Sequence, residues 1–426
     1  MAAGTPDEVV AVAQVLWAQQ ELLYAVFDYY ASLGSTTDDA YAIGGNAFKQ
    51  WLCDAKIAFE ASHDVLFHTI NKRSAKLRGE EDKHNSQTGL NRHEFLAALL
   101  HIALSEFSDA HLPPRALERL LLERIAPHVP PEAHHCADTL RQELCYKEGV
   151  DVTLRQYEPL LRALYETYSF GYGEVGHVLL DRHMLSLDEW TELCRHLKLR
   201  DDAFSQRVMR LTFVWSRMRV IRESDTKGRR KMTHLTFLDF CEACVRVASL
   251  KALPTDAILQ HHGCAHAGEF VDKLHVQGLY ATFVADHDPA VAVRAGGARP
   301  QPIERALYHL LSLVASSITK AIGISPSGPP HTWSIGPHQV AAFKRKCFVN
   351  SDDAARQGDA PGASEADDEG RAPPRRSLAR QSTCGVAVKD HARPSLAALA
   401  ESTEPTLDSG GGGGVESEGG AEEVLT

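Results

Sequence analysis

The sequence lacks the motifs that mark the common enzyme classes. It contains no glycine-rich phosphate-binding loop, no GxSxG nucleophile motif and no HExxH zinc motif. Its 22 histidines show no spacing that singles out a catalytic Ser–His–Asp set. We therefore expect a protein that is not an enzyme.

Long apolar runs and an excess of positive charge are also missing. No run of about 18 apolar residues occurs, so we expect no membrane span, and no basic stretch followed by an apolar one marks a signal peptide. Residues 351–426 hold 15 acidic and 7 basic side chains and so contribute −8 to the net charge of −11, which leaves −3 for the first 350 residues. Because the first 350 residues are nearly neutral, we expect no nucleic-acid partner. We also expect a cytoplasmic protein.

The cysteines form no disulfide framework, because they are scattered and odd in number, and this favours buried reduced thiols. The nine are Cys53, Cys136, Cys145, Cys194, Cys241, Cys244, Cys264, Cys347 and Cys384. Cys241 and Cys244 form a CxxC, but it has no second pair and lies in an apolar helical pattern. We therefore interpret both as core residues, and the histidine- and cysteine-rich segment 261–266 as a polar loop.

Apolar residues recur at helical spacing along most of the chain, and alternating strand patterns are almost absent. The predicted helical segments are 10–32, 46–57, 58–71, 95–107, 117–125, 137–147, 151–169, 187–197, 201–222 and 236–250. The expected fold class is all-α.

The remaining sequence divides into two regions. Residues 251–345 are predicted to form an additional helical region, in which 304–324 carry a broad apolar stripe. This stripe fits a partner helix in a groove or a third core element, and we favour the core element; a helix docked within the chain satisfies both. Residues 346–426 are rich in Gly, Ser and acidic residues and are predicted to be a disordered tail, because they bury too little to offset the entropy of ordering.

An internal repeat is the most informative feature of the first 250 residues. Four segments recur in the same order at nearly constant offsets: 22–30 at 160–168 (offset 138), Ile43 with 47–48 at Leu185 with 189–190 (142), 66–67 at 212–213 (146) and 90–98 at 235–243 (145). Amphipathic helices resemble one another by chance, but chance does not explain the shared order and spacing. We predict a duplicated helical unit, with one copy in residues 1–132 and the other in 133–250.

Each copy carries the pattern apolar-x-x-x-acid-aromatic. It occurs at Leu90-Glu94-Phe95, Leu185-Glu189-Trp190 and Leu235-Asp239-Phe240, and without the acid at Ile43-Ala47-Phe48. The exiting helices resemble those of EF-hand, calmodulin-like proteins, especially divergent hands of algal and protist proteins. In that family the apolar residue at loop position 8 pairs with the other hand, and the acid at position 12 grips calcium.

The resemblance makes Glu94, Glu189 and Asp239 candidate calcium ligands, each at position 12 of its loop. The residues themselves allow a simpler interpretation, because an acid in the first turn of a helix is favoured by the helix dipole and the free N–H groups. The loops also depart from the family, since calcium needs about 6–8 oxygen ligands. Positions 1, 3 and 5 are Thr36, Asp38 and Ala40; Lys83, Asn85 and Gln87; Val178, Leu180 and Arg182; and Gly228, Arg230 and Met232. Val, Leu, Met and Arg supply no oxygen, although a shift of register would bring in Asp225 or residues 80–82.

We interpret the chain as two tandem EF-hand-like pairs that keep their helices and have lost most calcium ligands. This predicts a non-catalytic binding or scaffold protein that needs no cofactor, with a groove between paired helices that holds an amphipathic helix of a protein partner. The alternative is a calcium-dependent regulator that uses atypical loops. The family resemblance alone implies a role at a cilium or the cytoskeleton.

Overall fold

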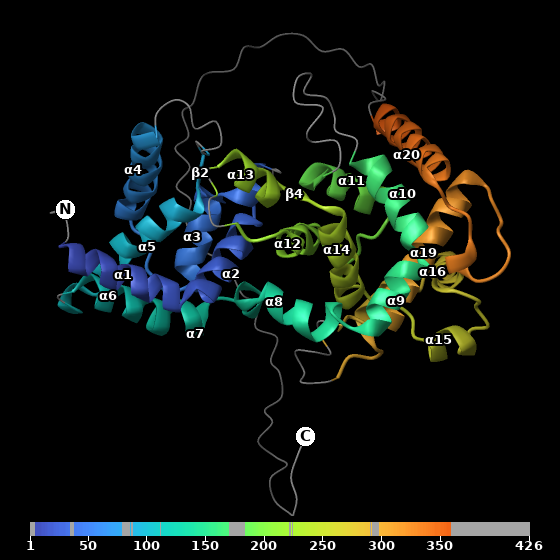
Figure 1. Ribbon diagram of the computed structural model, residues 1–426, viewed down its shortest axis with the longest axis horizontal. Helices are drawn as coiled ribbons and strands as arrows, with labels where there is room; N and C mark the ends of the chain where they lie inside the picture. Colours follow the sequence, from blue (N-terminus) through green and yellow to red (C-terminus); the bar gives the residue numbers. More distant parts are fainter. Residues whose placement is uncertain are drawn as a thin grey trace, which may run out of the picture. The chain divides into compact units, whose positions relative to one another are not determined.

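The computed structural model describes residues 5–34, 38–78, 86, 88–110, 112–169, 184–220, 223, 225–289, 291 and 298–358, and these residues are helical apart from two short strand pairs (Figure 1). The all-α prediction is therefore confirmed. The residues up to 132 form α1 (Pro6–Ala18), α2 (Gln20–Ala31), η1 (Asp38–Tyr41), β1 (Ile43–Gly44), α3 (Gly45–Asp54), α4 (Ala61–Arg78), β2 (Gly89–Leu90), α5 (Arg92–Glu106), η2 (Ser108–Ala110), α6 (Pro113–Arg119), η3 (Leu120–Ile125) and α7 (Ala126–His128).

The following residues continue the helical pattern. They form η4 (Pro131–His134), α8 (Ala137–Leu140), η5 (Arg141–Cys145), α9 (Glu148–Gln156), α10 (Glu158–Tyr168), β3 (Leu185–Ser186), α11 (Leu187–His196), α12 (Gln206–Ser216), α13 (Thr226–Thr233), β4 (His234–Leu235) and α14 (Phe237–Leu250). The C-terminal region, from residue 251, forms α15 (Asp256–His261), α16 (Ala267–Gln277), α17 (Tyr280–Asp286), α19 (Ile303–Ile322), η6 (Pro330–Thr332) and α20 (Pro337–Gly358). We refer to residues 5–132 as the first half and to 133–250 as the second half.

The repeated sequence segments fall on helices that follow one another in the same order in both halves. The first segment lies in α2 and α10, the second at the start of α3 and α11, the third in α4 and α12, and the fourth in α5 and α14. The aromatic residues Phe48, Phe67 and Phe95 and their counterparts Trp190, Phe213 and Phe240 are all buried. The shared order therefore extends to the side chains that fill each core.

A two-residue antiparallel strand pair joins the two loops of each half. Ile43 pairs with Leu90 in the first half, and Leu185 pairs with Leu235 in the second. These are the four apolar residues that the sequence pattern placed at equivalent positions, and their expected pairing is confirmed. The first pair requires a glycine at Gly89, because a Cβ atom there would lie 2.9 Å from the Cβ atom of Ala42.

The C-terminal region packs on the second half, and the two share one apolar core. Helix α19 lies against α9, α14, α16 and α20, and its apolar stripe, including Leu307, Leu310 and Ile318, is buried. Where α16 crosses α19, a Cβ atom at Gly268 would collide with Ser316, so the glycine lets the two helices approach closely. Residues 304–324 are thus largely a core element of this chain.

Several expected boundaries differ from the structure. The predicted start of the tail at residue 346 is wrong, because helix α20 runs to Gly358. Side chains of α20 extend the apolar core beyond residue 345. The segments 1–132, 133–250 and 251–345 belong to one compact unit, Met1–Ala360, and the rest of the predicted tail lies outside the described residues. The segments 10–32 and 151–169 are each broken once, at Gln19 and Tyr157, because the chain turns there between two packed helices.

Among the residues that the structure describes, no single helix is both long and apolar enough to cross a membrane, while the bent pair α1 and α2 passes only when its two helices are taken together.

Candidate functional site: the paired loops and the arginine junction

The three candidate calcium ligands are capping residues at the start of their helices. The Glu94 carboxylate accepts a hydrogen bond from the backbone N–H of Asn91 at 2.7 Å. Glu189 accepts from the Ser186 N–H at 2.7 Å, and Asp239 accepts from the Thr236 N–H at 2.9 Å. Each acid thus forms one side of a capping box, which satisfies N–H groups that the helix leaves unbonded.

Two of these acids are buried, and Asp239 is partly buried. Glu94 is 1% exposed and Glu189 is 6% exposed. Burial raises the pKa of Glu189, although hydrogen bonds from Ser186 act in the opposite direction. Burial, followed by the nearby charges of Asp239 and Glu189, also raises the pKa of Tyr165, so the second half brings its two capping acids to one region. Glu94 lies apart from them, in the first half.

The residues that were expected to form a ligand-bearing loop before α14 form a helix instead. Gly228, Arg230 and Met232 belong to α13, and the Asp225 carboxylate caps this helix by accepting a hydrogen bond from the Gly228 N–H at 3.3 Å. The prediction of an open loop there is wrong, because the segment has its own N-cap and buries Met232.

The other expected loops are described only in part. In the first, Asp38 and Ala40 lie in η1, and Ala40 is buried. Thr36, the positions 83, 85 and 87 of the second loop, positions 178, 180 and 182 of the third, and residues 80–82 lie outside the described residues. Across the part of the chain that the structure describes, no group of three or more His, Cys, Asp or Glu side chains is arranged to hold a metal ion.

Histidine and cysteine side chains, which can also bind metals, instead contact other parts of this chain. The Nδ1 atom of His266 accepts a hydrogen bond from the Glu269 N–H and so caps α16. His135 lies over Trp215, with ring centroids 3.8 Å apart, and burial lowers the pKa of His135 to about 4. Cys241 and Cys244 are buried in α14, where burial raises the pKa of both thiols.

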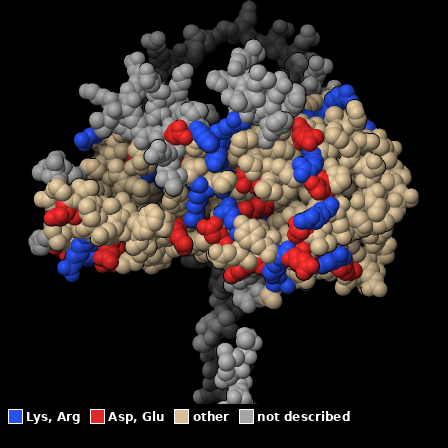
Figure 2. Space-filling view, in the orientation of Figure 1, with Lys and Arg blue, Asp and Glu red and all other residues tan. Residues whose placement is uncertain are grey.

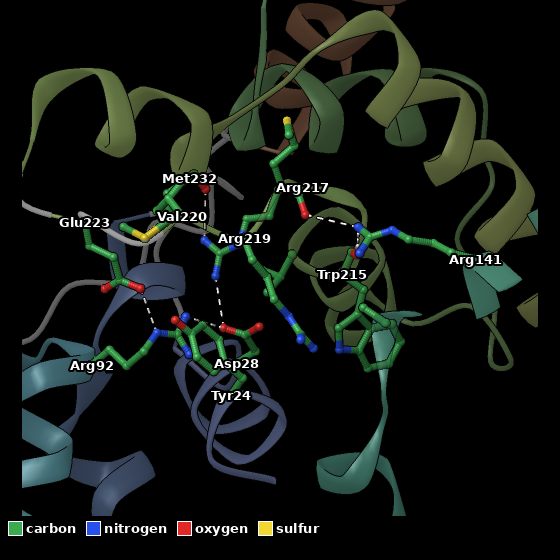
Figure 3. Close-up of a pocket in the computed structure, with 13 residues that line it drawn as sticks. Tyr24, Asp28, Arg92, Arg141, Trp215, Arg217, Arg219, Val220, Glu223 and Met232 are labelled. Carbon is green, nitrogen blue, oxygen red and sulfur yellow. Dashed lines mark hydrogen bonds and ion pairs between the residues drawn. The ribbon is translucent and has the colours of Figure 1, made fainter. Parts of the chain in front are cut away.

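A cluster of charged residues joins the two halves. We call Asp28, Arg92, Arg141, Arg217 and Glu223 the arginine junction. Arg92 and Arg217 both donate to the same Asp28 oxygen, each at 3.0 Å, and Figure 3 shows them converging on it. Because Asp28 and Arg92 belong to the first half and Arg217 to the second, this carboxylate connects the halves directly.

Each arginine of the pair has a second anchor. The Nε atom of Arg92 donates to Glu223 at 2.7 Å, and its guanidinium lies 4.0 Å from the Tyr24 ring centroid. The Nη1 atom of Arg217 donates to the Met232 carbonyl at 2.9 Å. Burial lowers the pKa of Arg92, but the charges of Asp28 and Glu223 outweigh burial, so its pKa is raised and the group stays charged.

Arg141 forms hydrogen bonds with the segment between α12 and α13. Its Nη2 atom donates to the carbonyls of Trp215 and Arg217, both at 3.2 Å, and its Nε atom donates to Glu242 at 2.9 Å. A small hollow, with a cavity volume of about 20 Å³ and partly open to solvent, lies between these groups. Figure 2 shows basic and acidic side chains interspersed over this face, in keeping with charges that pair with each other. The junction therefore links residues of the two helical halves through paired charges.

The second half also holds an amphipathic helix of its own chain. Val340 and Phe343 of α20 are buried, and α20 packs against α10 and α19. Lys344 donates to the Thr167 carbonyl at the end of α10, at 3.3 Å. Phe343 meets the ring of His196, at the end of α11, with centroids 6.4 Å apart. Helix α20 therefore packs at the ends of α10 and α11.

The arginine junction did not emerge from the sequence analysis, although one signal was available. Arg92 occupies the repeat position that holds Phe237 in the second half, so a buried charge replaces an aromatic ring. Such a departure from the repeat marks a position with a separate role. Its partners, however, lie 64 residues away at Asp28 and 131 residues away at Glu223, and no local pattern identifies them.

Comparison with known proteins found no matching family model, no matching curated protein and no matching solved structure.

Proposed function

We propose that this chain is a non-catalytic scaffold built from two EF-hand-like pairs, which bind a protein partner without using calcium. One observation carries the proposal. The two loops of each half are joined at the apolar positions that a hand pair uses, while the acids at Glu94, Glu189 and Asp239 bond to their own helix starts. The pairing of the loops persists, and the ligand positions serve the helices instead.

The arrangement of α20 supports a partner that is an amphipathic helix. Its core-facing side follows the spacing i, i+3, i+7 at the buried Val340 and Phe343 and the partly buried Cys347, and Arg345 and Lys346 are exposed. We infer that a partner helix with this apolar spacing occupies the same groove when α20 leaves it. The family resemblance further suggests a cytoplasmic location at a cilium or the cytoskeleton.

A calcium titration separates this proposal from the calcium-regulator alternative. We expect isothermal titration of the full chain with calcium, up to about millimolar concentration, to give no binding heat, because too few oxygens face any described loop. Saturable heat that disappears in Glu189→Gln or Asp239→Asn would instead establish the alternative function.

A labelled peptide with the sequence of residues 335–349 tests the groove. In Phe343→Asp, a carboxylate replaces a ring that is 2% exposed, so α20 should detach and the peptide should bind. Wild type and the matched control Arg345→Asp, which places the same carboxylate on the exposed side of α20, should bind the peptide at least ~10-fold more weakly, which fluorescence anisotropy measures. A folded Phe343→Asp variant that binds no peptide contradicts the groove proposal.

A further inference from the structure

The first helix presents an exposed apolar face. Trp17 is 73% exposed, Val9 is 62% exposed and Val10 is 56% exposed, whereas Val12 and Leu16 of the same helix pack on the core of the first half. Scattered apolar residues on a protein surface need no explanation, but a large ring and two valines on one short helix form a patch. Such patches mark interaction surfaces.

Trp17 is more exposed to solvent than the other four tryptophans. Trp51, Trp190 and Trp215 are buried, and Trp333 is partly buried. Tryptophan is enriched where proteins meet other molecules, because it offers a large apolar area at a small entropic cost. Leaving its ring in water on α1 costs hydrophobic free energy that a contact would recover.

The charge distribution selects the occupant. Residues 9–20 contain no charged side chain, and the first basic side chain in the chain is Lys49. A helix that binds an anionic membrane surface normally carries Lys or Arg, whereas α1 carries only Asp7 and Glu8, which such a surface repels. An uncharged face meets no like-charge repulsion when it packs against an identical copy of itself.

The shape of the face is self-complementary as well. Val10, Ala13 and Trp17 follow one another at i, i+3 and i+7, so they line one side of the helix. In an antiparallel pair related by a two-fold axis, the Trp17 ring of each copy would lie over the small Ala13 of the other. We propose that α1 is a self-association surface, through which two copies of this chain pair by their first helices.

The size of the face sets the strength of this contact. Trp17, Val9, Val10 and Ala13 expose roughly 400 Å² of apolar surface per copy, so a dimer would bury roughly 800 Å², against about 1,200–2,000 Å² in stable complexes. The dimer is therefore expected to be transient.

Sedimentation velocity of the full chain between about 5 and 500 µM tests the proposal. We expect the sedimentation coefficient to rise with concentration, and acrylamide quenching of Trp17, measured as the difference between wild type and Trp17→Phe, to fall in parallel. Trp17→Glu and Val10→Glu should weaken association at least ~10-fold, whereas the matched control Val276→Glu, at a site that is 89% exposed on α16, should leave it unchanged.

Three results would overturn the proposal. The first is a wild-type chain that remains monomeric throughout this range. The second is equal loss of association in Val276→Glu. The third is protection of Trp17 by phosphatidylcholine–phosphatidylserine vesicles in a chain that stays monomeric, which would assign the face to a lipid surface.

Discussion

Substitution of Asp28 tests whether the arginine junction holds the two halves together. In Asp28→Ala, Arg92 and Arg217 each lose a charged partner at 3.0 Å, although their side chains are only 10% and 5% exposed. Removal of one member of a buried ion pair commonly costs about 3–5 kcal/mol, because the remaining charge stays desolvated. Here Arg92 keeps Glu223 and Arg217 keeps the Met232 carbonyl, so we expect a smaller loss of about 2–4 kcal/mol in the free energy of unfolding.

Urea denaturation of the full chain, followed by circular dichroism at equilibrium, measures this loss. Asp28→Asn should lose less than Asp28→Ala, because its amide oxygen still accepts one hydrogen bond without a charge. Asp272→Ala is the matched control, since the Lys320–Asp272 pair is 64% and 43% exposed and its loss should cost under about 1 kcal/mol. If Asp28→Ala costs no more than this control, the junction is not a stabilising connection and our reasoning is refuted.

Three further measurements test the packing of the site. Gly89→Ala should destabilise the chain by about 1–3 kcal/mol in urea denaturation because its new methyl group meets Ala42, whereas Gly45→Ala, with open space around the new Cβ, should be neutral or stabilising. Glu189→Ala should cost about 1 kcal/mol through loss of a capping box, and a loss near zero would contradict the capping role. Burial, with smaller effects of nearby basic charges, lowers the pKa of His196 to about 4 in the folded state. Because the unfolded chain binds this proton more readily, the free energy of unfolding should fall as the pH drops from 6.5 to about 4. In urea titrations at several pH values, His196→Gln should flatten this dependence.

Local sequence patterns carried much of the helical arrangement. The spacing of apolar residues placed α5, α11 and α14 within a few residues of their observed bounds, because a helix that buries one side must repeat its apolar residues with the helical period. The offsets between repeated segments predicted which helices correspond. The family resemblance, and not the periodicity, implied that these apolar loop residues pair between hands, and Ile43 pairs with Leu90 and Leu185 with Leu235.

The sequence pattern failed where a short segment is stabilised by its surroundings. Helix α13 has a high charge density and no apolar stripe, and its formation rests on the Asp225 cap and on burial of Met232. Helix α20 begins with only a few apolar residues, and its apolar side, at Val340 and Phe343, gains stability only against α10 and α19. The Asp225 cap of α13 is adjacent in the sequence, but burial of Met232 and the packing of α20 on α10 depend on the fold, so a window along the chain contains too little information to predict either helix.

The amino-acid order by itself determined the helical class and predicted the order of the repeated segments, because periodicity and spacing are properties of neighbouring residues. Only the tertiary structure decided that Asp28 meets Arg92 and Arg217, and that α20 packs against α10 and α19. These contacts join residues separated by 64 to 189 positions, and a charge finds its partner through the folded arrangement of whole helices rather than through its neighbours along the chain.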